Sequence, residues 1–254
     1  MPTAAPQNPA LLPPPPLPEF LSQRFPFHRH LLPLHRGANA GLRLHLVDHG
    51  PERASAGAPT VVLLHGNPTW SFLWRKVMRR LEDFRIVAPD LLGLGLSSHL
   101  PRMEDHQLPR HAEAIAEALE VLDVRDAVCV AQDWGGPILT TAASMVPERV
   151  RGWVLGNTAV VVPKHPRNTA FHRFARRPVI SDLVFRGFGF PQRALHKAQG
   201  DPDSIRGDIA RAYRWPLDGA RLGQEIPDPP DSGKGGGLFP GYRRRVAPLD
   251  LARM

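Results

Sequence analysis

Four short apolar runs, separated by segments of helical periodicity, are the feature that most constrains the fold of this chain. The runs are TVVLLHG, RIVAPD, AVCVAQ and VRGWVLGN. Continuous apolar strands of this kind are buried on both faces, as they are in parallel sheets. The alternation therefore predicts an α/β fold: a mostly parallel sheet flanked by helices, with its ligand site at the carboxyl ends of the strands.

The pattern divides the chain into four parts. Residues 1–27 include LLPPPPLPEF and predict a Pro-rich N-terminal arm that is disordered or draped over the surface. Residues 28–157 predict the α/β core, in which GLRLHLVDHG alternates like a half-buried strand. Residues 158–222 predict short amphipathic helices that form a cap over the sheet edge, and residues 223–254 an irregular, poorly ordered tail.

Composition excludes several classes of function. The net charge of +8 comes from scattered arginines without a basic stripe or an aromatic stacking platform, so no nucleic-acid partner is predicted. No apolar run approaches the roughly 18 to 20 residues that a membrane span needs, and prolines interrupt the N-terminus, so we expect a cytoplasmic protein without a membrane span. A single cysteine, Cys129, excludes an internal disulfide and a cysteine metal cluster. We predict no metal and no cofactor.

The decapeptide VAQDWGGPIL places Asp133 between a strand and a helix. A strand, a tight turn and a helix with a nucleophile at the apex form a nucleophile elbow, which often carries serine. Small residues at 131, 135 and 136 suit its strained backbone. With Asp133 at the apex, a carboxylate would attack the substrate and form an ester. The decapeptide alone fits an aspartate that caps the following helix equally well.

A second stretch, LLHGNPTWSFLWR, favours the catalytic interpretation. Its buried strand ends in His65, Gly66 and Asn67, where an oxyanion hole takes one of its backbone N–H groups. The Asn67 side chain and the Trp134 indole offer two neutral N–H donors that can hold an anion. Separately, Asn67 fits a turn and Trp134 a core position, but their presence beside Asp133 favours an anion site.

The segments HGNPTWSFLWR, APDLLGLGLSS and QDWGG resemble the haloalkane dehalogenase group of the α/β-hydrolases, which includes the related β-lactone (oxetanone) decarboxylases of olefin biosynthesis. The resemblance covers about residues 42–214. It implies the α/β-hydrolase fold, with a helical cap inserted after the strand that follows the elbow helix, and a small apolar substrate.

The resemblance also implies roles for individual residues. Asp133 would be the nucleophile, Asn67 and the Trp134 ring nitrogen would bind the departing halide, and the backbone amides of Asn67 and Trp134 would form the oxyanion hole. In the decarboxylases the same aspartate would act on a β-lactone, and the motifs do not separate the two reactions. Epoxide hydrolases, with an aromatic residue at position 67, and fluoroacetate dehalogenases, with an arginine at position 134, are less similar.

The resemblance further implies a general-base histidine after the last strand and a carboxylate that supports it. No histidine follows His196, and Asn157 occupies the position where some dehalogenases have the acid. We therefore expect the last strands, the base and the acid to be absent from this chain. His65 is expected to order its loop, and His165 and His172 to lie on the cap surface. A non-catalytic α/β-hydrolase remnant is the alternative function.

Two further predictions concern side chains outside these motifs. In VFRGFGF, Phe185, Phe188 and Phe190 would line an apolar substrate pocket, although a helix that merely packs on the core explains them equally well. Asp90, in APDLLGLG, is expected to fix the turn between its strand and the following loop.

Overall fold

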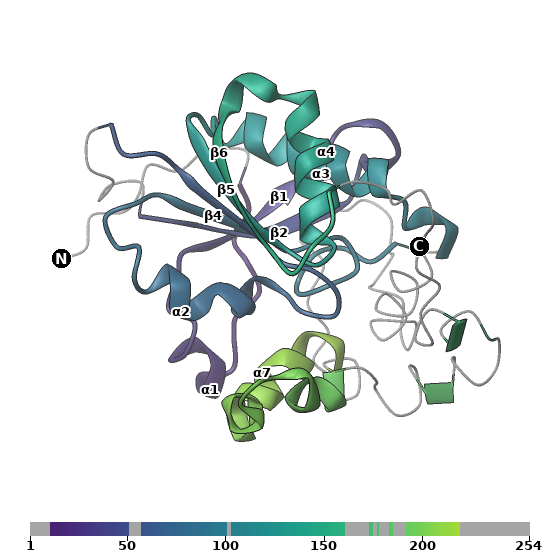
Figure 1. The fold of residues 1–254 in the computed structure, drawn as a ribbon. Helices are drawn as coiled ribbons and strands as arrows, with labels where there is room; N and C mark the ends of the chain where they lie inside the picture. The colour runs from purple at the N-terminus through teal and green to yellow at the C-terminus, as the bar shows by residue number, and fades with distance from the viewer. Residues whose placement is uncertain are drawn as a thin grey trace.

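A six-stranded sheet with the order β1-β2-β4-β3-β5-β6 forms the centre of the molecule (Figure 1). The computed structural model describes residues 11–50, 57–100, 103–160, 173–174, 177, 183–184 and 192–218. Strands β3 to β6 pair in parallel, whereas β2 runs antiparallel to both β1 and β4. The prediction of a mostly parallel α/β sheet is therefore confirmed. The strands are β1 Arg29–Pro33, β2 Arg43–His49, β3 Val61–Leu64, β4 Ile86–Pro89, β5 Ala127–Gln132 and β6 Val150–Gly156.

Helices cover both faces of the sheet, and the apolar runs supply a side chain to each face in turn. In β3, Val62 and Leu64 pack into the core cluster under α3 (Leu108–Val121) and α4 (Gly135–Met145). Val61 and Leu63 pack into a second cluster with residues of α1 (Glu19–Ser22), η2 (Ser71–Trp74) and α7 (Gly207–Asp218). Among the described helices, none is long and apolar enough to cross a membrane. The main helices are α1 Glu19–Ser22, α2 Arg75–Met78, α3 Leu108–Val121, α4 Gly135–Met145 and α7 Gly207–Asp218, and the 3-10 helices are η1 Gly37–Asn39, η2 Ser71–Trp74, η3 Met103–Asp105, η4 Pro147–Arg149, η6 Gln192–Ala198 and η7 Pro202–Ile205.

Strand β2 departs from the half-buried strand that its alternation predicts. Its polar residue His45 is fully buried, between Leu44 and Leu46, which are also buried. The His45 ring is accommodated because its Nδ1 lies 2.8 Å from a carboxylate oxygen of Asp90. Alternation failed to predict this burial because the partner comes from a distant part of the sequence.

For residues 11–27, the draped arm and not the disordered one agrees with the structure. Leu12 exchanges two backbone hydrogen bonds with Leu31 of β1, at 2.8 and 2.9 Å. Helix α1 follows, and the side chains of Leu21 and Phe25 are buried in the second core cluster. Leucine and phenylalanine between the prolines thus provide an apolar face, which stabilises this segment where composition alone indicated disorder. Residues 1–10 lie outside the described part.

In the segment from 158 to 222 the described residues include η6, η7 and α7. Ala212, Tyr213 and Trp215 of α7 are buried in the second core cluster. The three predicted pocket residues Phe185, Phe188 and Phe190, and the tail from 223 to 254, lie outside the described residues.

Strand β6 is the last strand of the sheet in the described part of the chain, and its side chains are unusually exposed. Trp153, Val154 and Leu155 are 41%, 56% and 40% exposed. Because successive side chains in a strand point to opposite faces, both faces of β6 present apolar surface.

Candidate active site

Asp133 lies in a strained turn between β5 and α4. Its φ angle of 53° is in the left-handed region, which a residue with a side chain adopts rarely. The Asp133 N–H donates to the Asn157 carbonyl at 3.2 Å, and the Thr158 hydroxyl donates to the Asp133 carbonyl at 2.6 Å. Helix α4 has Trp134 as its N-cap residue and no side-chain cap bond. In this structure the Asp133 carboxylate therefore does not cap the helix.

Two glycines allow neighbouring strands to approach this turn. A Cβ atom on Gly66 would collide with the side chain of Asp133, and one on Gly135 would collide with the carbonyls of Leu64 and His65. The backbone of the loop after β3 thus lies directly against the turn after β5. Sequence patterns indicated the need for small residues at 135 and 136 but gave no signal for Gly66.

The backbone N–H of Asn67 donates to Oδ1 of Asp133 at 2.8 Å. A tight turn fixes this donor, because the Thr69 N–H and the Thr69 hydroxyl both donate to the Gly66 carbonyl at 3.0 Å. The structure therefore brings Asn67 and Asp133 together, with one carboxylate oxygen held by a backbone amide. Trp134 follows Asp133 directly, and its partly buried side chain packs against the core cluster of α3 and α4.

Both ring nitrogens of His65 are occupied. Nδ1 lies 2.9 Å from the Gly66 carbonyl, to which it donates, and Nε2 accepts from the Leu91 N–H at 3.0 Å. Burial lowers the pKa of His65, so the ring stays neutral at physiological pH. His65 therefore joins the loops after β3 and β4, and neither nitrogen is available to take a proton from water.

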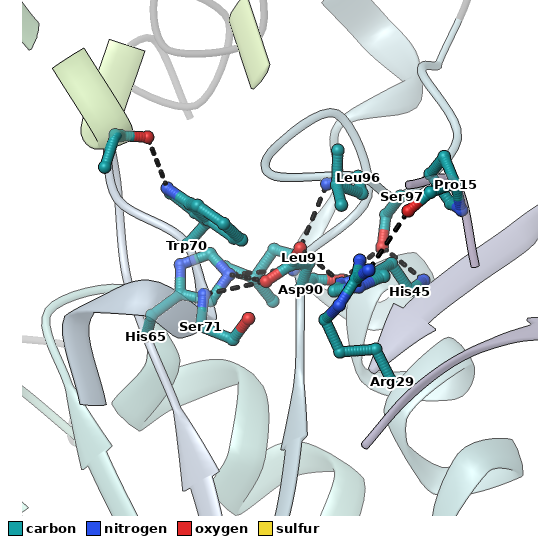
Figure 2. A network of polar contacts seen from close by, with 11 residues as sticks. Pro15, Arg29, His45, His65, Trp70, Ser71, Asp90, Leu91, Leu96 and Ser97 are labelled. Carbon is teal, nitrogen blue, oxygen red and sulfur yellow. Dashed lines mark hydrogen bonds and ion pairs between the residues drawn. The ribbon is translucent and has the colours of Figure 1, made fainter. Parts of the chain in front are cut away.

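A buried carboxylate, Asp90, organises the loops on the other side of His65 (Figure 2). It accepts hydrogen bonds from the N–H of Ser71 at 2.7 Å and from the N–H of Leu96 at 2.9 Å, and its Oδ2 lies 2.8 Å from Nδ1 of His45. Burial opposes its charge, but His45 and the surrounding donors hold the pKa of the Asp90 carboxyl below its usual value. As the sequence predicted, Asp90 fixes the loop that follows its strand.

Residues 59–204 match the family model for the alpha/beta hydrolase fold. The strand order and the turn at Asp133 agree with that match. The chain belongs to the α/β-hydrolase family. A solved structure with the same fold is that of haloalkane dehalogenase DpaA from Paraglaciecola agarilytica, with a TM-score of 0.59 and 24% identity over 91% of this chain and 70% of that one.

In sequence, this α/β-hydrolase is similar to haloalkane dehalogenases. Haloalkane dehalogenase 2 of Mycobacterium tuberculosis is 38% identical over 174 residues, which are 68% of this chain and 57% of the relative. A haloalkane dehalogenase of Mycolicibacterium paratuberculosis is 35% identical over 186 residues, or 71% and 60% of the two chains. The chain thus spans less than two thirds of the length of these curated relatives.

In the described part of this α/β-hydrolase, no hydrogen bond joins Asp133 to a histidine. Its hydrogen-bonding partners are Asn67, Gly136, Asn157 and Thr158. Thr158 was missed as a site residue because a threonine at the start of an insertion carries no local pattern. His196 lies in η6, whereas His165 and His172 are outside the described residues. Within the same part, no three His, Cys, Asp or Glu side chains are grouped to hold a metal ion.

Proposed function

We propose that this chain carries the nucleophilic half of a haloalkane dehalogenase site. The observation that carries the proposal is the 2.8 Å hydrogen bond from the Asn67 N–H to Asp133 Oδ1. With Oδ1 held, Oδ2 is the oxygen that attacks the carbon of an alkyl halide. A C–O bond forms as the carbon–halogen bond breaks, and the halogen leaves with the bonding electrons as a halide ion.

The same geometry suits the second step of the proposed reaction. When water attacks the alkyl ester at the Asp133 carboxyl carbon, negative charge develops on the carbonyl oxygen, which is Oδ1. The Asn67 amide already contacts that atom, and a preorganised N–H donor costs little reorganisation. The Trp134 amide is the proposed second donor, and the side chains of Asn67 and Trp134 are the proposed halide ligands.

Ester hydrolysis also requires a general base to take a proton from the attacking water. His65 does not fill this role because both its ring nitrogens are occupied. In the described residues, alkylation is therefore better supported than hydrolysis. The proposal is that this chain forms an alkyl ester on Asp133 and releases it slowly.

A single-turnover experiment tests this proposal. The purified protein is incubated with 1-bromobutane, bromide is measured, and the intact mass is followed. We expect one bromide per protein and a stable butyl adduct that maps to Asp133. Asp133→Asn should release no bromide. Asp126→Asn is the matched control, because Asp126 also has a left-handed backbone, with a φ of 51°, but pairs with Arg151 on the surface.

The other outcomes discriminate among the alternatives. Repeated bromide release by the unmodified chain would show that a base outside the described residues completes the site. Neither bromide nor adduct from a protein with a folded circular dichroism spectrum would favour the non-catalytic remnant. Bromide release that survives Asp133→Asn would exclude Asp133 as the nucleophile.

A further inference from the structure

The N-terminal arm makes direct contact with helix α7. A guanidinium nitrogen of Arg24 lies 3.0 Å from a carboxylate oxygen of Asp208, and the guanidinium of Arg211 lies 4.0 Å from the centre of the Phe20 ring. The arm therefore contacts a helix that lies nearly 200 residues further along the chain. Figure 1 shows α1 next to α7, away from the layer of α3 and α4. Each contact alone is weak because the side chains are partly exposed.

A buried junction lies between this contact and the candidate active site. Trp70 is only 1% exposed, and its indole N–H donates to the Ala212 carbonyl of α7 at 3.2 Å. The same ring lies 5.3 Å from the ring of Phe25 in the arm and stacks on Phe72 at 5.5 Å. Trp70 thus touches the arm and is hydrogen-bonded to α7, as Figure 2 shows for the bond to α7.

Trp70 also belongs to the loop that carries the Asn67 amide. The turn from Gly66 to Thr69 is closed by two hydrogen bonds onto the Gly66 carbonyl, so Trp70 is joined to Asn67 by a compact turn. The next residue, Ser71, is held by Asp90. A shift of Trp70 toward or away from α7 would therefore be transmitted to the donor that contacts Asp133 Oδ1.

We propose that the arm and Trp70 form a brace, defined by Phe20, Arg24, Phe25 and Trp70, which holds α7 against the loop after β3. In this brace Trp70 is a positioning residue for the Asn67 N–H. The proposed effect on alkylation rests on the proposed function, whereas the effect on backbone opening does not. A purely structural role for Trp70 would affect overall stability without a selective effect on the 66–70 turn and α7.

Two tryptophan variants test the role of Trp70. Trp70→Phe removes the donor to α7, and Trp74→Phe is the matched control, because the buried Trp74 indole N–H meets no acceptor among the described residues. Loss of one net hydrogen bond should speed amide hydrogen exchange in α7 and in residues 66–70 by about 2- to 10-fold. The rate of the bromide burst should fall by a similar factor, and both readouts should stay unchanged in Trp74→Phe.

The two readouts keep the brace and the proposed function distinguishable. If the unmodified protein releases no bromide, the proposed function fails, and hydrogen exchange at residues 66–70 alone decides on the brace. If exchange in the Trp70→Phe variant matches that of Trp74→Phe, the brace is excluded. If α7 opens faster while the turn and the bromide burst are unchanged, Trp70 holds α7 but does not position Asn67, and the proposal is overturned.

A second pair of variants tests the arm itself. Arg24→Gln removes the partner of Asp208 and leaves the α7 sequence unchanged, while Arg206→Gln removes a more exposed ion pair with Asp203 that does not involve the arm. Hydrogen exchange in α7 should become faster in Arg24→Gln than in Arg206→Gln, and high salt should remove the difference. Equal exchange in the two variants at low salt would show that the arm does not brace α7.

Discussion

Asp90→Asn is the substitution whose cost the structure defines best. An asparagine has the shape of the aspartate but replaces one carboxylate oxygen with an NH₂ group, which donates only. Asp90 receives the N–H groups of Ser71 and Leu96 and contacts the ring of His45. In either amide orientation, at least one buried backbone N–H would face an NH₂ group.

The expected loss of stability follows from these contacts. A buried N–H left without an acceptor costs about 1–3 kcal/mol. The hydrogen bonds that survive lose their charge assistance, which is worth about 1 kcal/mol each. With two surviving contacts, the free energy of unfolding should fall by about 3–5 kcal/mol, which is a large part of the total for a domain of this size.

Urea denaturation followed by circular dichroism at pH 7 measures this loss. Asp126→Asn is the control, since that aspartate makes an exposed pair with Arg151 and its loss should be nearly neutral. A decrease for Asp90→Asn no larger than that for Asp126→Asn would refute the view that Asp90 organises the loops. A decrease of several kcal/mol with an unchanged m-value would support it.

Two further predictions concern pH and association. Burial lowers the pKa of His106 to about 4 and that of His111 to about 3, so both rings are neutral in the folded protein at pH 7. Their contribution to stability is fully present above pH 6.5 and is lost as the pH falls below that value. Urea denaturation should therefore show a steady loss of stability from pH 6.5 toward pH 4, and a flat profile would contradict this prediction. Val154 is 56% exposed on β6, the last described strand. Val154→Lys should therefore reduce the concentration-dependent association of the chain with itself, as measured by light scattering. Val77→Lys is the control and should not change this association, because Val77 lies on α2, where it is 38% exposed.

Local pattern predicted those features that depend on neighbouring residues in the sequence. The parallel strands and the turn at Asp133 are encoded by short apolar runs and by the spacing of small residues, so they could be predicted. The contact between Asn67 and Asp133 was predictable because the carboxyl ends of adjacent parallel strands meet at one edge of the sheet.

Features that depend on distant partners were missed. Burial of His45 requires Asp90 from the loop after β4, and ordering of the arm requires Trp70 to cover Phe25. Proline content suggested disorder because composition does not show where the intervening apolar side chains will find a surface. Thr158 was missed for a related reason, since its bond to Asp133 depends on the path of the chain after β6.

The described core supports the proposed alkylation of Asp133 better than it supports the proposed hydrolysis of the alkyl ester. The Asp133 backbone is held by groups after β6, and its carboxylate by the loop after β3, so three adjacent strand ends fix the Asp133 carboxylate. Alkylation needs little beyond this arrangement and a bound alkyl halide. Hydrolysis needs a base that the described strand ends do not bring to Asp133. The two steps should therefore be separable in this chain, and the lifetime of an alkyl ester on Asp133 measures how far the second step is supported.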